Sequence, residues 1–249
     1  MSDNTNILFD TLSTAEIDLA NATFTYKEQL ASQYNKDFPR DLPIGIRHLH
    51  FYWHRSARSR INLQDAYEFA SQYAGEISTL RLVQLSKIIK NKKPRLIYEF
   101  GAGVSTLLMA QLIKPYGGKI VTFEQSPEYY DKFNSIFPLE FKDTAEIKLC
   151  PVRLDWFGDF RGIYYEFSAP EHIDFVYIDG ATRTRGNQES DFVYPRVNAD
   201  IVRMQNSGTI VDYAVTDHRW VNFLFYQESL SGHSVKPSRW WKSIIIKKR

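Results

Sequence analysis

The chain has 249 residues, 43% of them hydrophobic, which fits one large α/β domain with an extension and excludes a disordered protein. The net charge of +2, from 31 basic and 29 acidic residues, creates no overall field that would require nucleic acid or a membrane. The single cysteine, Cys150, excludes an internal disulfide and is typical of a reducing compartment. Since we find neither a signal sequence nor an apolar run of membrane-spanning length, we expect a soluble, cytoplasmic protein.

Residues 1–74 mix polar and aromatic side chains and are predicted to form a mainly helical extension. Helices are expected near residues 14–21 and 63–73, with a break at the prolines of 39–43. The segment lacks the alternation of strands and helices that would make it half of a Rossmann-type sheet. We therefore place a domain boundary near residue 75.

The segment from His48 to Arg60 combines histidines, arginines and aromatic rings. The spacing of His48, His50 and His54 would suit zinc if two of them shared a strand face, but no cysteine or carboxylate is interleaved to complete the set. Basic and aromatic side chains in this pattern can also stack bases or bind phosphates. A solvated loop or a contact between domains needs no ligand and is the simpler interpretation.

The stretch 95–124, RLIYEFGAGVSTLLMAQLIKPYGGKIVTFE, contains the most specific pattern in the chain. It follows a helix predicted over residues 77–90. The stretch predicts a buried strand over 96–100, a glycine turn, a helix that ends near Pro115, and a second strand over 120–123. This is a βαβ unit whose glycine turn lies at the carboxyl end of the first strand, where doubly wound sheets bind ligands.

The charge of this turn distinguishes between possible ligands. A dinucleotide site would have a third glycine where this chain has Thr106. Glu99 would also repel a pyrophosphate near the start of the helix. A ligand that carries an amino group and a sulfonium fits this charge better. A turn that only packs a helix against a strand is the alternative without a ligand.

The motif EFGAGVST, with Glu124 closing the next strand, resembles the cofactor motif of class I S-adenosylmethionine-dependent methyltransferases, in the branch where serine replaces the third glycine. The resemblance covers about residues 75–249. It implies an α/β, Rossmann-like, doubly wound and mostly parallel seven-stranded sheet with an antiparallel C-terminal strand. Residues 1–74 would then cap the cofactor and shape the acceptor pocket. The implied cofactor-binding residues are Glu99, Gly101, Ala102, Gly103, Ser105, Thr106, Glu124, Gln125, Val152, Arg153 and Asp179.

Further elements follow in the same alternation. Ser126 and Pro127 are typical of a helix start, because serine caps and proline suits the first helical position. Asp155 and Trp156 either contribute a hydrogen bond or an apolar wall to the ligand site or form an ordinary surface turn. The remaining expected elements are a helix to about 137, strands at 146–152, 173–178 and 209–212, a helix at about 189–205 that is broken or delayed near Pro195, a helix capped by Asp217 or Thr216 that runs to about 229, and a C-terminal hairpin around 235 and 243–246.

Two strands are predicted to end in carboxylates, Asp179 and Asp212, and the carboxyl ends of parallel strands meet at one edge of a sheet. Either aspartate, or His218, is a candidate general base for a hydroxyl acceptor. Arg183 and Arg185 are candidates for binding an acceptor carboxylate or phosphate, or belong to a solvated lid. Tyr213, beside Asp212, is a further candidate for substrate binding.

The two aspartates would also suit magnesium. Metal-dependent catechol-type O-methyltransferases, however, have Asp-Asn where this chain has Asp212-Tyr213, so one ligand would be missing and we expect no metal. We expect a methyltransferase that uses S-adenosylmethionine and acts on a hydroxyl of a small molecule or sugar. The alternatives are N-methylation of an amine or protein, and a noncatalytic cofactor-binding or nucleic-acid-binding protein. A nicotinamide oxidoreductase ranks last because of Glu99.

Overall fold

The computed structural model describes residues 79–158, 160–180, 197–217, 219–238 and 243–249. The predicted extension 1–74, with its segment from His48 to Arg60, lies outside the described residues. The same holds for Arg183, Arg185 and His218.

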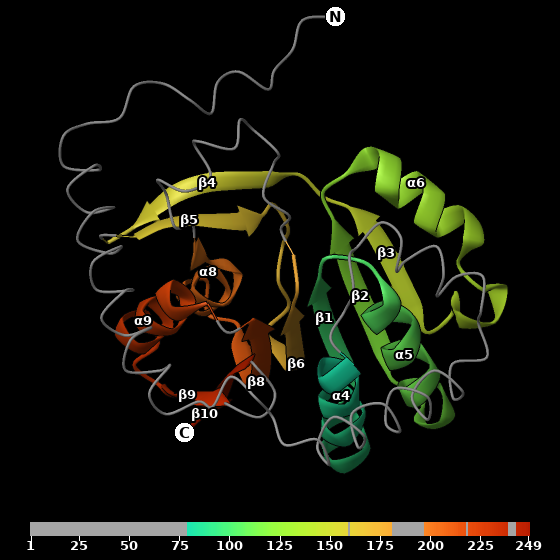
Figure 1. Cartoon of the computed structure of the whole chain (residues 1–249), viewed down its shortest axis with the longest axis horizontal. Coiled ribbons are helices and arrows are strands. Elements are labelled where there is room, and N and C mark those ends of the chain that lie inside the picture. Colours follow the sequence, from blue (N-terminus) through green and yellow to red (C-terminus); the bar gives the residue numbers. More distant parts are fainter. Residues whose placement is uncertain (1–78, 159, 181–196, 218, 239–242) are drawn as a thin grey trace, which may run out of the picture.

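A seven-stranded sheet with the order β3-β2-β1-β6-β8-β10-β9 forms the centre of the described structure (Figure 1). β10 is antiparallel to both of its neighbours, and the other pairs are parallel. The predicted Rossmann-like sheet with an antiparallel strand near the C-terminus is therefore confirmed. The strands are β1 Leu96–Phe100, β2 Lys119–Glu124, β3 Ala145–Leu149, β6 His172–Ile178, β8 Ile210–Asp217, β9 His233–Ser238 and β10 Ser243–Lys248.

Helices cover both faces of this sheet (Figure 1). One face packs against α4 Thr79–Lys92, α5 Val104–Ile113 and α6 Pro127–Ile136. The other packs against α8 Asp200–Asn206 and α9 Trp220–Ser229. Two short 3-10 helices, η2 Lys114–Tyr116 and η3 Leu139–Phe141, follow α5 and α6.

The strand β1 shows why the sheet is buried on both sides. Ile97 belongs to the apolar cluster under α4 and α5, whereas Phe100 belongs to the cluster on the α8 side. Both side chains are 0% exposed. Side chains alternate between the faces of a strand, so a nearly continuous apolar run is what a strand covered on both faces requires.

The predicted start of α6 is confirmed. Ser126 lies at the N-cap and its hydroxyl accepts a hydrogen bond from the backbone N–H of Tyr129, while Pro127 occupies the first turn. Proline lacks an N–H that would have no partner at this position. α6 therefore begins directly after β2, beside the glycine turn.

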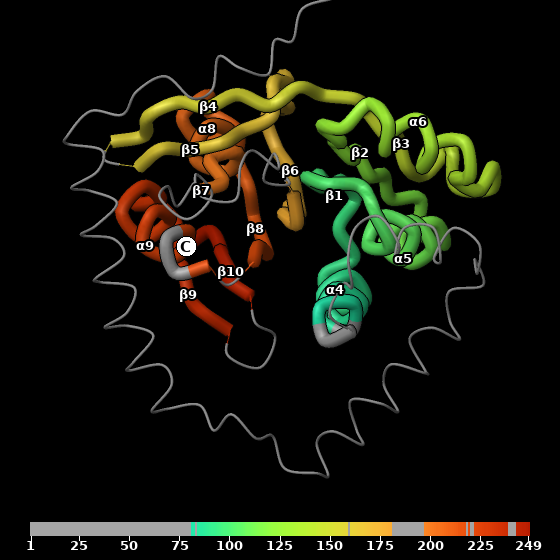
Figure 2. The backbone as a smooth tube through the Cα atoms, turned by 45° about the horizontal axis from the view of Figure 1, so that its top comes forward, coloured from blue at the N-terminus to red at the C-terminus, as the bar shows by residue number. Residues whose placement is uncertain are grey.

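The strand predicted at 146–152 is two strands in different sheets. β3 ends at Leu149, and Val152 begins β4 Val152–Phe157, which pairs antiparallel with β5 Phe160–Tyr165. β7 Val197–Asn198 completes this three-stranded sheet, and Figure 2 shows β4 and β5 side by side near α8. The break lies at Pro151, which has no N–H for a ladder. The alternative of a surface turn at Asp155 and Trp156 is thus wrong, because both residues belong to β4.

In the described residues, the segment predicted as a helix over 189–205 contains a short strand followed by a shorter helix. Val197 and Asn198 form β7, and α8 begins only at Asp200. Val197 pairs with Gly162 of β5, where a side chain would collide with Phe157 and Ala199. A tertiary contact thus decides the structure of these residues, which local periodicity assigns to a helix.

The prediction that a strand ends at Asp212 is wrong, because β8 continues to Asp217. Ala214, Val215 and Thr216 are buried and pair with the second half of β6. Asp212 and its neighbour are consequently near the amino end of the strand. Asp217 is the carboxylate of β8 that lies at the carboxyl edge of the sheet.

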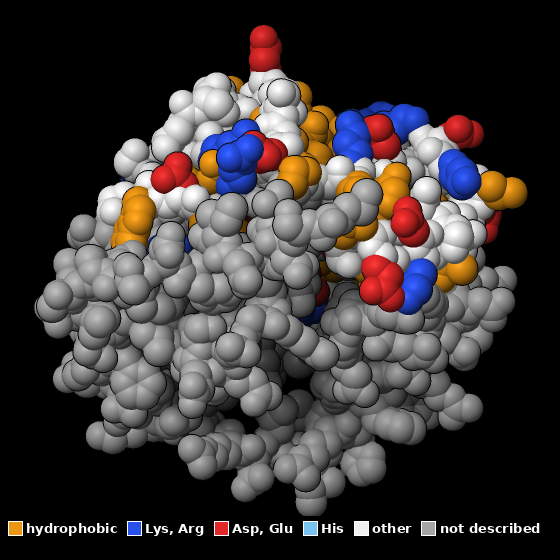
Figure 3. All heavy atoms as spheres, turned by 90° about the horizontal axis from the view of Figure 1, so that it is seen from above, with side chains coloured by type: hydrophobic (Ala, Val, Ile, Leu, Met, Phe, Trp, Pro, Cys, Tyr) orange, Lys and Arg blue, Asp and Glu red, His pale blue; other side chains and the backbone are white. Residues whose placement is uncertain are grey.

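The described surface has no single dominant charge on the face drawn in Figure 3, where acidic and basic side chains are interspersed. None of the helices in the described ranges is both long and apolar enough to cross a membrane.

Candidate active site

The glycine turn after β1 and the end of β6 are packed backbone against backbone. The carbonyl oxygen of Phe100 accepts hydrogen bonds from the N–H groups of Asp179, at 3.0 Å, and Gly180, at 2.7 Å. Gly101 has a φ of +98°, and a Cβ there would lie 2.9 Å from the nitrogen of Gly180. A Cβ on Gly180 would in turn lie 2.9 Å from the Cα of Gly101. Both positions therefore need glycine, and the two turns lie in direct backbone contact.

Glu99 lies beneath this turn with 0% exposure. Its carboxylate accepts hydrogen bonds from the hydroxyls of Ser105 at 2.5 Å, Thr106 at 2.6 Å and Thr122 at 2.8 Å. Burial raises the pKa of Glu99 to about 7, although the three hydroxyl donors oppose this shift. Glu99, Ser105 and Thr106, which we predicted as cofactor contacts, are turned toward one another, and we assign them a positioning role for the loop.

We expect Glu99→Gln to change the pH dependence of stability. The folded-state pKa of about 7 lies above the ordinary value of 4.5, so the folded protein keeps a proton that the unfolded chain releases between these pH values. The free energy of unfolding therefore decreases as pH rises through this window, by about 3 kcal/mol for this one group. The glutamine variant lacks this loss, so its stability relative to the wild type should increase by a similar amount from pH 4.5 to 7.

Urea unfolding at several pH values measures this difference. Subtracting the wild-type curve removes the contribution of Asp200, whose pKa burial also raises to about 7. Glu140→Gln, at a side chain that is 58% exposed, is the control and should show no pH-dependent difference. A constant difference between Glu99→Gln and the wild type would show that Glu99 is ionised throughout.

Glu124, at the end of β2, joins the loop to α6. Its side chain accepts hydrogen bonds from the backbone N–H of Ala102 at 3.2 Å and of Ser126 at 2.8 Å. Burial raises the pKa of Glu124, while the N–H groups of Ser126, Ala102 and Gln125 oppose the shift. A carboxylate has about four acceptor positions, so Glu124 can still accept donors from a ligand. Glu124 is therefore the side chain in this loop best placed to bind hydroxyls.

The other residues predicted around the cofactor occupy different surroundings. Gly103 is the N-cap of α5, and its N–H donates to Thr106 at 3.0 Å. Gln125 is partly buried directly after Glu124. Val152 packs on the apolar cluster of the α8 face. Arg153 is 63% exposed and forms an ion pair with Glu166 at 2.6 Å, which holds its guanidinium on the surface.

Asp179 forms an ion pair with Arg81 of α4. The residue as a whole is exposed, but its side chain is only 22% exposed and also accepts a hydrogen bond from the hydroxyl of Tyr177 at 3.3 Å. Burial raises the pKa of Asp179, Arg81 opposes this, and the nearby Asp217 adds to it. Sequence reasoning missed Arg81, although its position four residues before the buried Leu85 placed a charge on the apolar face of the helix.

Asp217 is the neighbour of Asp179 across the sheet. Each follows a member of the register pair formed by Ile178 and Thr216. Asp217 accepts hydrogen bonds from the backbone N–H of Arg219 at 3.1 Å, from its Nε at 2.6 Å, and from Asn222 at 2.9 Å. We predicted Asp217 only as a possible cap of the next helix, because the strand was expected to end earlier.

Buried polar groups lie under the same edge. Asn198 donates a hydrogen bond to the carbonyl of Gly180 at 3.2 Å. The hydroxyl of Tyr165, 0% exposed, lies 3.0 Å from where a Cβ of Gly180 would be, and it has no hydrogen-bond partner among the described residues. An unpaired buried hydroxyl costs free energy.

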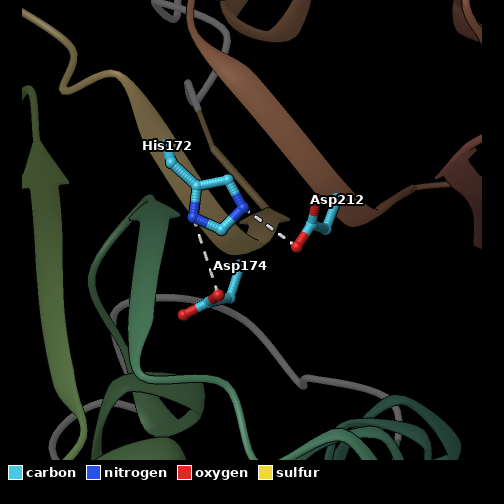
Figure 4. Close-up of side chains that lie close together, drawn as sticks. All are labelled: His172, Asp174 and Asp212. Atoms are coloured by element: carbon cyan, nitrogen blue, oxygen red, sulfur yellow. Dashed lines mark hydrogen bonds and ion pairs between the residues drawn. The ribbon is translucent and has the colours of Figure 1, made fainter.

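Asp212 lies at the opposite, amino edge of the sheet, where its carboxylate is 3.0 Å from Nε2 of His172 (Figure 4). Nδ1 of the same ring lies 3.8 Å from Asp174, which also accepts the backbone N–H groups of Arg95 and Leu96 at 2.7 Å. Each nitrogen of the ring faces a different carboxylate. The His172 ring and the two aspartates therefore connect the first residues of β1, β6 and β8. The predicted convergence of Asp212 with Asp179 is wrong.

Tyr213 also lies away from Asp179. It is paired with Phe175, in the first half of β6. Its ring contacts that of Phe175, with the centroids 6.0 Å apart, and Nζ of Lys92 lies 4.5 Å from its centroid. The side chain thus packs at the amino half of the sheet, away from the glycine turns.

Comparisons with known proteins agree with this architecture. No family model matches the sequence, and no curated protein matches it significantly. A methyltransferase from Podospora anserina, whose crystal structure has SAH bound, is 12% identical with a TM-score of 0.52, over 85% of this chain and 100% of that one. A predicted O-methyltransferase from Klebsiella pneumoniae is 12% identical with a TM-score of 0.50, over 81% of this chain and 99% of that one. The chain therefore has the α/β fold of these proteins.

Proposed function

We propose that the protein is an S-adenosylmethionine-dependent methyltransferase that methylates a hydroxyl oxygen of a small molecule or sugar. The observation that carries the proposal is the paired glycine turn at the carboxyl edge of the sheet, with Glu124 at the end of the adjacent strand. The SAH bound to the Podospora anserina protein of the same fold supports the choice of cofactor.

The residues of the edge fit this cofactor. Gly101 and Gly180 let the two turns pack backbone against backbone at this edge, and the loop is held in place from below by the buried Glu99. Glu124 would accept the two ribose hydroxyls. When bound, S-adenosylmethionine supplies an activated methyl group on a sulfonium.

Within this proposal, Asp179 removes the proton of the acceptor hydroxyl. It stands at the end of β6 beside Gly180, and burial raises its pKa toward the range in which a carboxylate is an effective base. Asp217 accepts three hydrogen bonds from Arg219 and Asn222, which lie at the start of α9. We assign Asp217 to positioning the start of α9. The rest of the edge aligns the two reactants and excludes water.

We expect Asp179→Asn to lower kcat by about 100-fold or more while leaving the Kd of SAH within about twofold. Asparagine keeps the shape of the side chain but cannot accept the proton. The measurement is steady-state methyl transfer to an acceptor found by screening, combined with calorimetric titration of SAH. Asp212→Asn is the matched control, since it removes one carboxylate from the other edge of the sheet and should leave kcat unchanged. Wild-type turnover by Asp179→Asn would rule out this base.

The remaining assignments are proposals that the sequence supports. Residues 1–74 would cap the methyltransferase domain of 75–249, and Arg183, Arg185 and His218 would contribute to acceptor binding or proton transfer. We propose a cytoplasmic location, because the single cysteine excludes an internal disulfide and is typical of a reducing compartment.

Two alternatives compete with this function. N-methylation of an amine or protein would need less help from a base, and would predict a mild effect of Asp179→Asn. A noncatalytic cofactor-binding or nucleic-acid-binding protein would rely on the segment from His48 to Arg60. The interspersed charges in Figure 3 give no support for a nucleic-acid surface on that face of the described residues.

The first test is calorimetric titration of the full chain with S-adenosylmethionine, SAH and NAD. We expect micromolar binding of the two adenosyl ligands and none of NAD. Screening of hydroxylated and amine acceptors with methyl-labelled cofactor then separates O-methylation from N-methylation. Failure of both adenosyl ligands to bind would refute the proposed function.

A further inference from the structure

The carboxyl edge of the sheet contains two adjacent carboxylates, which would repel each other without a cation. Asp179 and Asp217 are lateral neighbours on β6 and β8, directly after the register pair of Ile178 and Thr216. Burial weakens the screening of this repulsion by water. Each site with two such carboxylates therefore needs a source of positive charge close by.

Arg81 supplies this charge from α4. Its guanidinium forms an ion pair with Asp179, is hydrogen-bonded to Tyr177, and interacts electrostatically with Asp217. The Arg81 side chain is only 16% exposed, so the pair is shielded from solvent more than an ordinary surface ion pair.

We propose that Arg81 is a built-in cation of the candidate active site, which occupies the place beside Asp179 that a divalent metal ion would take and makes the site independent of metal. The inference rests on the proposed function for its catalytic meaning. The claim that no divalent metal ion binds at Asp179 and Asp217 depends only on these residues and their neighbours, so it can be tested without knowing the reaction.

The residues present do not fit magnesium. Magnesium requires near-octahedral oxygen ligands, usually one or two carboxylates with water. Asp217 is paired with Arg219 and Asp179 with Arg81, so a guanidinium already lies against each carboxylate. The charges of the two aspartates are balanced by those of the two arginines. A divalent ion would have to displace a guanidinium from the site or lie against it.

Arg81 is not needed to dock α4 on the sheet. Leu82, Leu85 and Ile89 are almost completely buried and hold the helix by apolar contact. Gln84 adds a hydrogen bond to the hydroxyl of Ser243 on β10 at 2.9 Å. A substitution of Arg81 should therefore alter the charge of the site while the helix stays in place.

The test measures binding of Mn²⁺, a spectroscopic substitute for magnesium, to the full chain through the loss of the free-ion signal in electron paramagnetic resonance. Arg81→Gln should bind Mn²⁺ at least about tenfold more tightly than the wild type, because Asp179 loses its fixed counter-ion. Arg81→Lys keeps the charge and should behave like the wild type. Lys90→Gln, an exposed cation of the same helix, should also show no gain.

A double variant, Arg81→Gln with Asp179→Asn, locates the bound ion. It should lose the gain shown by Arg81→Gln. Any Mn²⁺ held by His172, Asp174 and Asp212 at the other edge is the same in both variants and cancels in the comparison. Wild-type binding of Mn²⁺ that Asp179→Asn removes would overturn the proposal. So would Arg81→Gln that is folded, as judged by circular dichroism and SAH titration, but gains no Mn²⁺ binding.

The two proposals can fail independently. If the wild type binds neither adenosyl ligand, the proposed methyltransferase function fails, but gain of Mn²⁺ binding by Arg81→Gln still supports the built-in cation. If SAH binds but methyl transfer depends on added Mg²⁺ and on Asp179, the methyltransferase function stands and the built-in cation is refuted.

Discussion

Gly101→Ala is expected to abolish measurable binding of SAH and to destabilise the protein by about 3 kcal/mol or more. The φ of +98° is one that L side chains rarely adopt, and the new Cβ would lie 2.9 Å from the nitrogen of Gly180. Relief of this clash would separate the ends of β1 and β6, where the hydrogen bonds to the carbonyl of Phe100 hold them together. Urea unfolding and calorimetric titration measure the two effects.

Gly208→Ala is the control that separates the effect of backbone strain from the effect of a steric clash. Gly208 has a similar φ of +91°, but a Cβ there would meet no atom within 4 Å. We expect it to cost about 1 to 2 kcal/mol of stability and to leave the affinity for SAH unchanged. If both variants bind SAH like the wild type, the packed glycines are a structural turn and the ligand site lies elsewhere.

Glu124→Ala is expected to weaken binding of S-adenosylmethionine and SAH by about ten- to hundredfold, which corresponds to roughly 1–3 kcal/mol. The variant removes the proposed acceptor for the ribose hydroxyls and also frees the N–H groups of Ala102 and Ser126. Calorimetric titration gives the change in Kd directly. A 2′-deoxy analogue of SAH should then lose affinity for the wild type but much less for Glu124→Ala.

Glu128→Ala is the control for this experiment. Glu128 is a solvent-exposed carboxylate on α6 that pairs with Lys132, so its removal should change neither stability nor affinity noticeably. Unchanged affinity of Glu124→Ala would remove Glu124 from the site. Equal losses with SAH and its 2′-deoxy analogue would indicate that Glu124 only holds the loop through Ala102 and Ser126.

Elements with strong local patterns were predictable from the sequence. The glycines after β1, the cap at Ser126 and the apolar runs of β1, β2 and β6 depend on contacts within a few residues, and the structure contains each of them. The βαβ unit followed from these signals because parallel strands require a crossover helix. The mostly parallel seven-stranded sheet with its antiparallel C-terminal strand agrees with the fold that the resemblance implied.

The ends of strands were less predictable. A carboxylate after an apolar run usually marks the end of a strand, but β8 continues past Asp212 because the next residues are also buried between β6 and β10. The same limit applied at Cys150 and Pro151, where one apolar run belongs to two sheets. Strand length depends on the partner strand, and a single sequence window does not contain that partner.

The sequence by itself determined the glycine turn, the acidic residue of the next strand and hence the class of ligand that we propose, because these features are local and have few structural interpretations. Only the tertiary structure decided which charged groups share the carboxyl edge. In the fold, Asp212 lies at the amino edge of the sheet, and Asp217 lies beside Asp179 at the carboxyl edge. Glu99 is buried beneath the loop, and Arg81 contacts Asp179 although the two are 98 positions apart in the sequence. Electrostatic partners are set by distance in space, and register, helix docking and burial fix that distance.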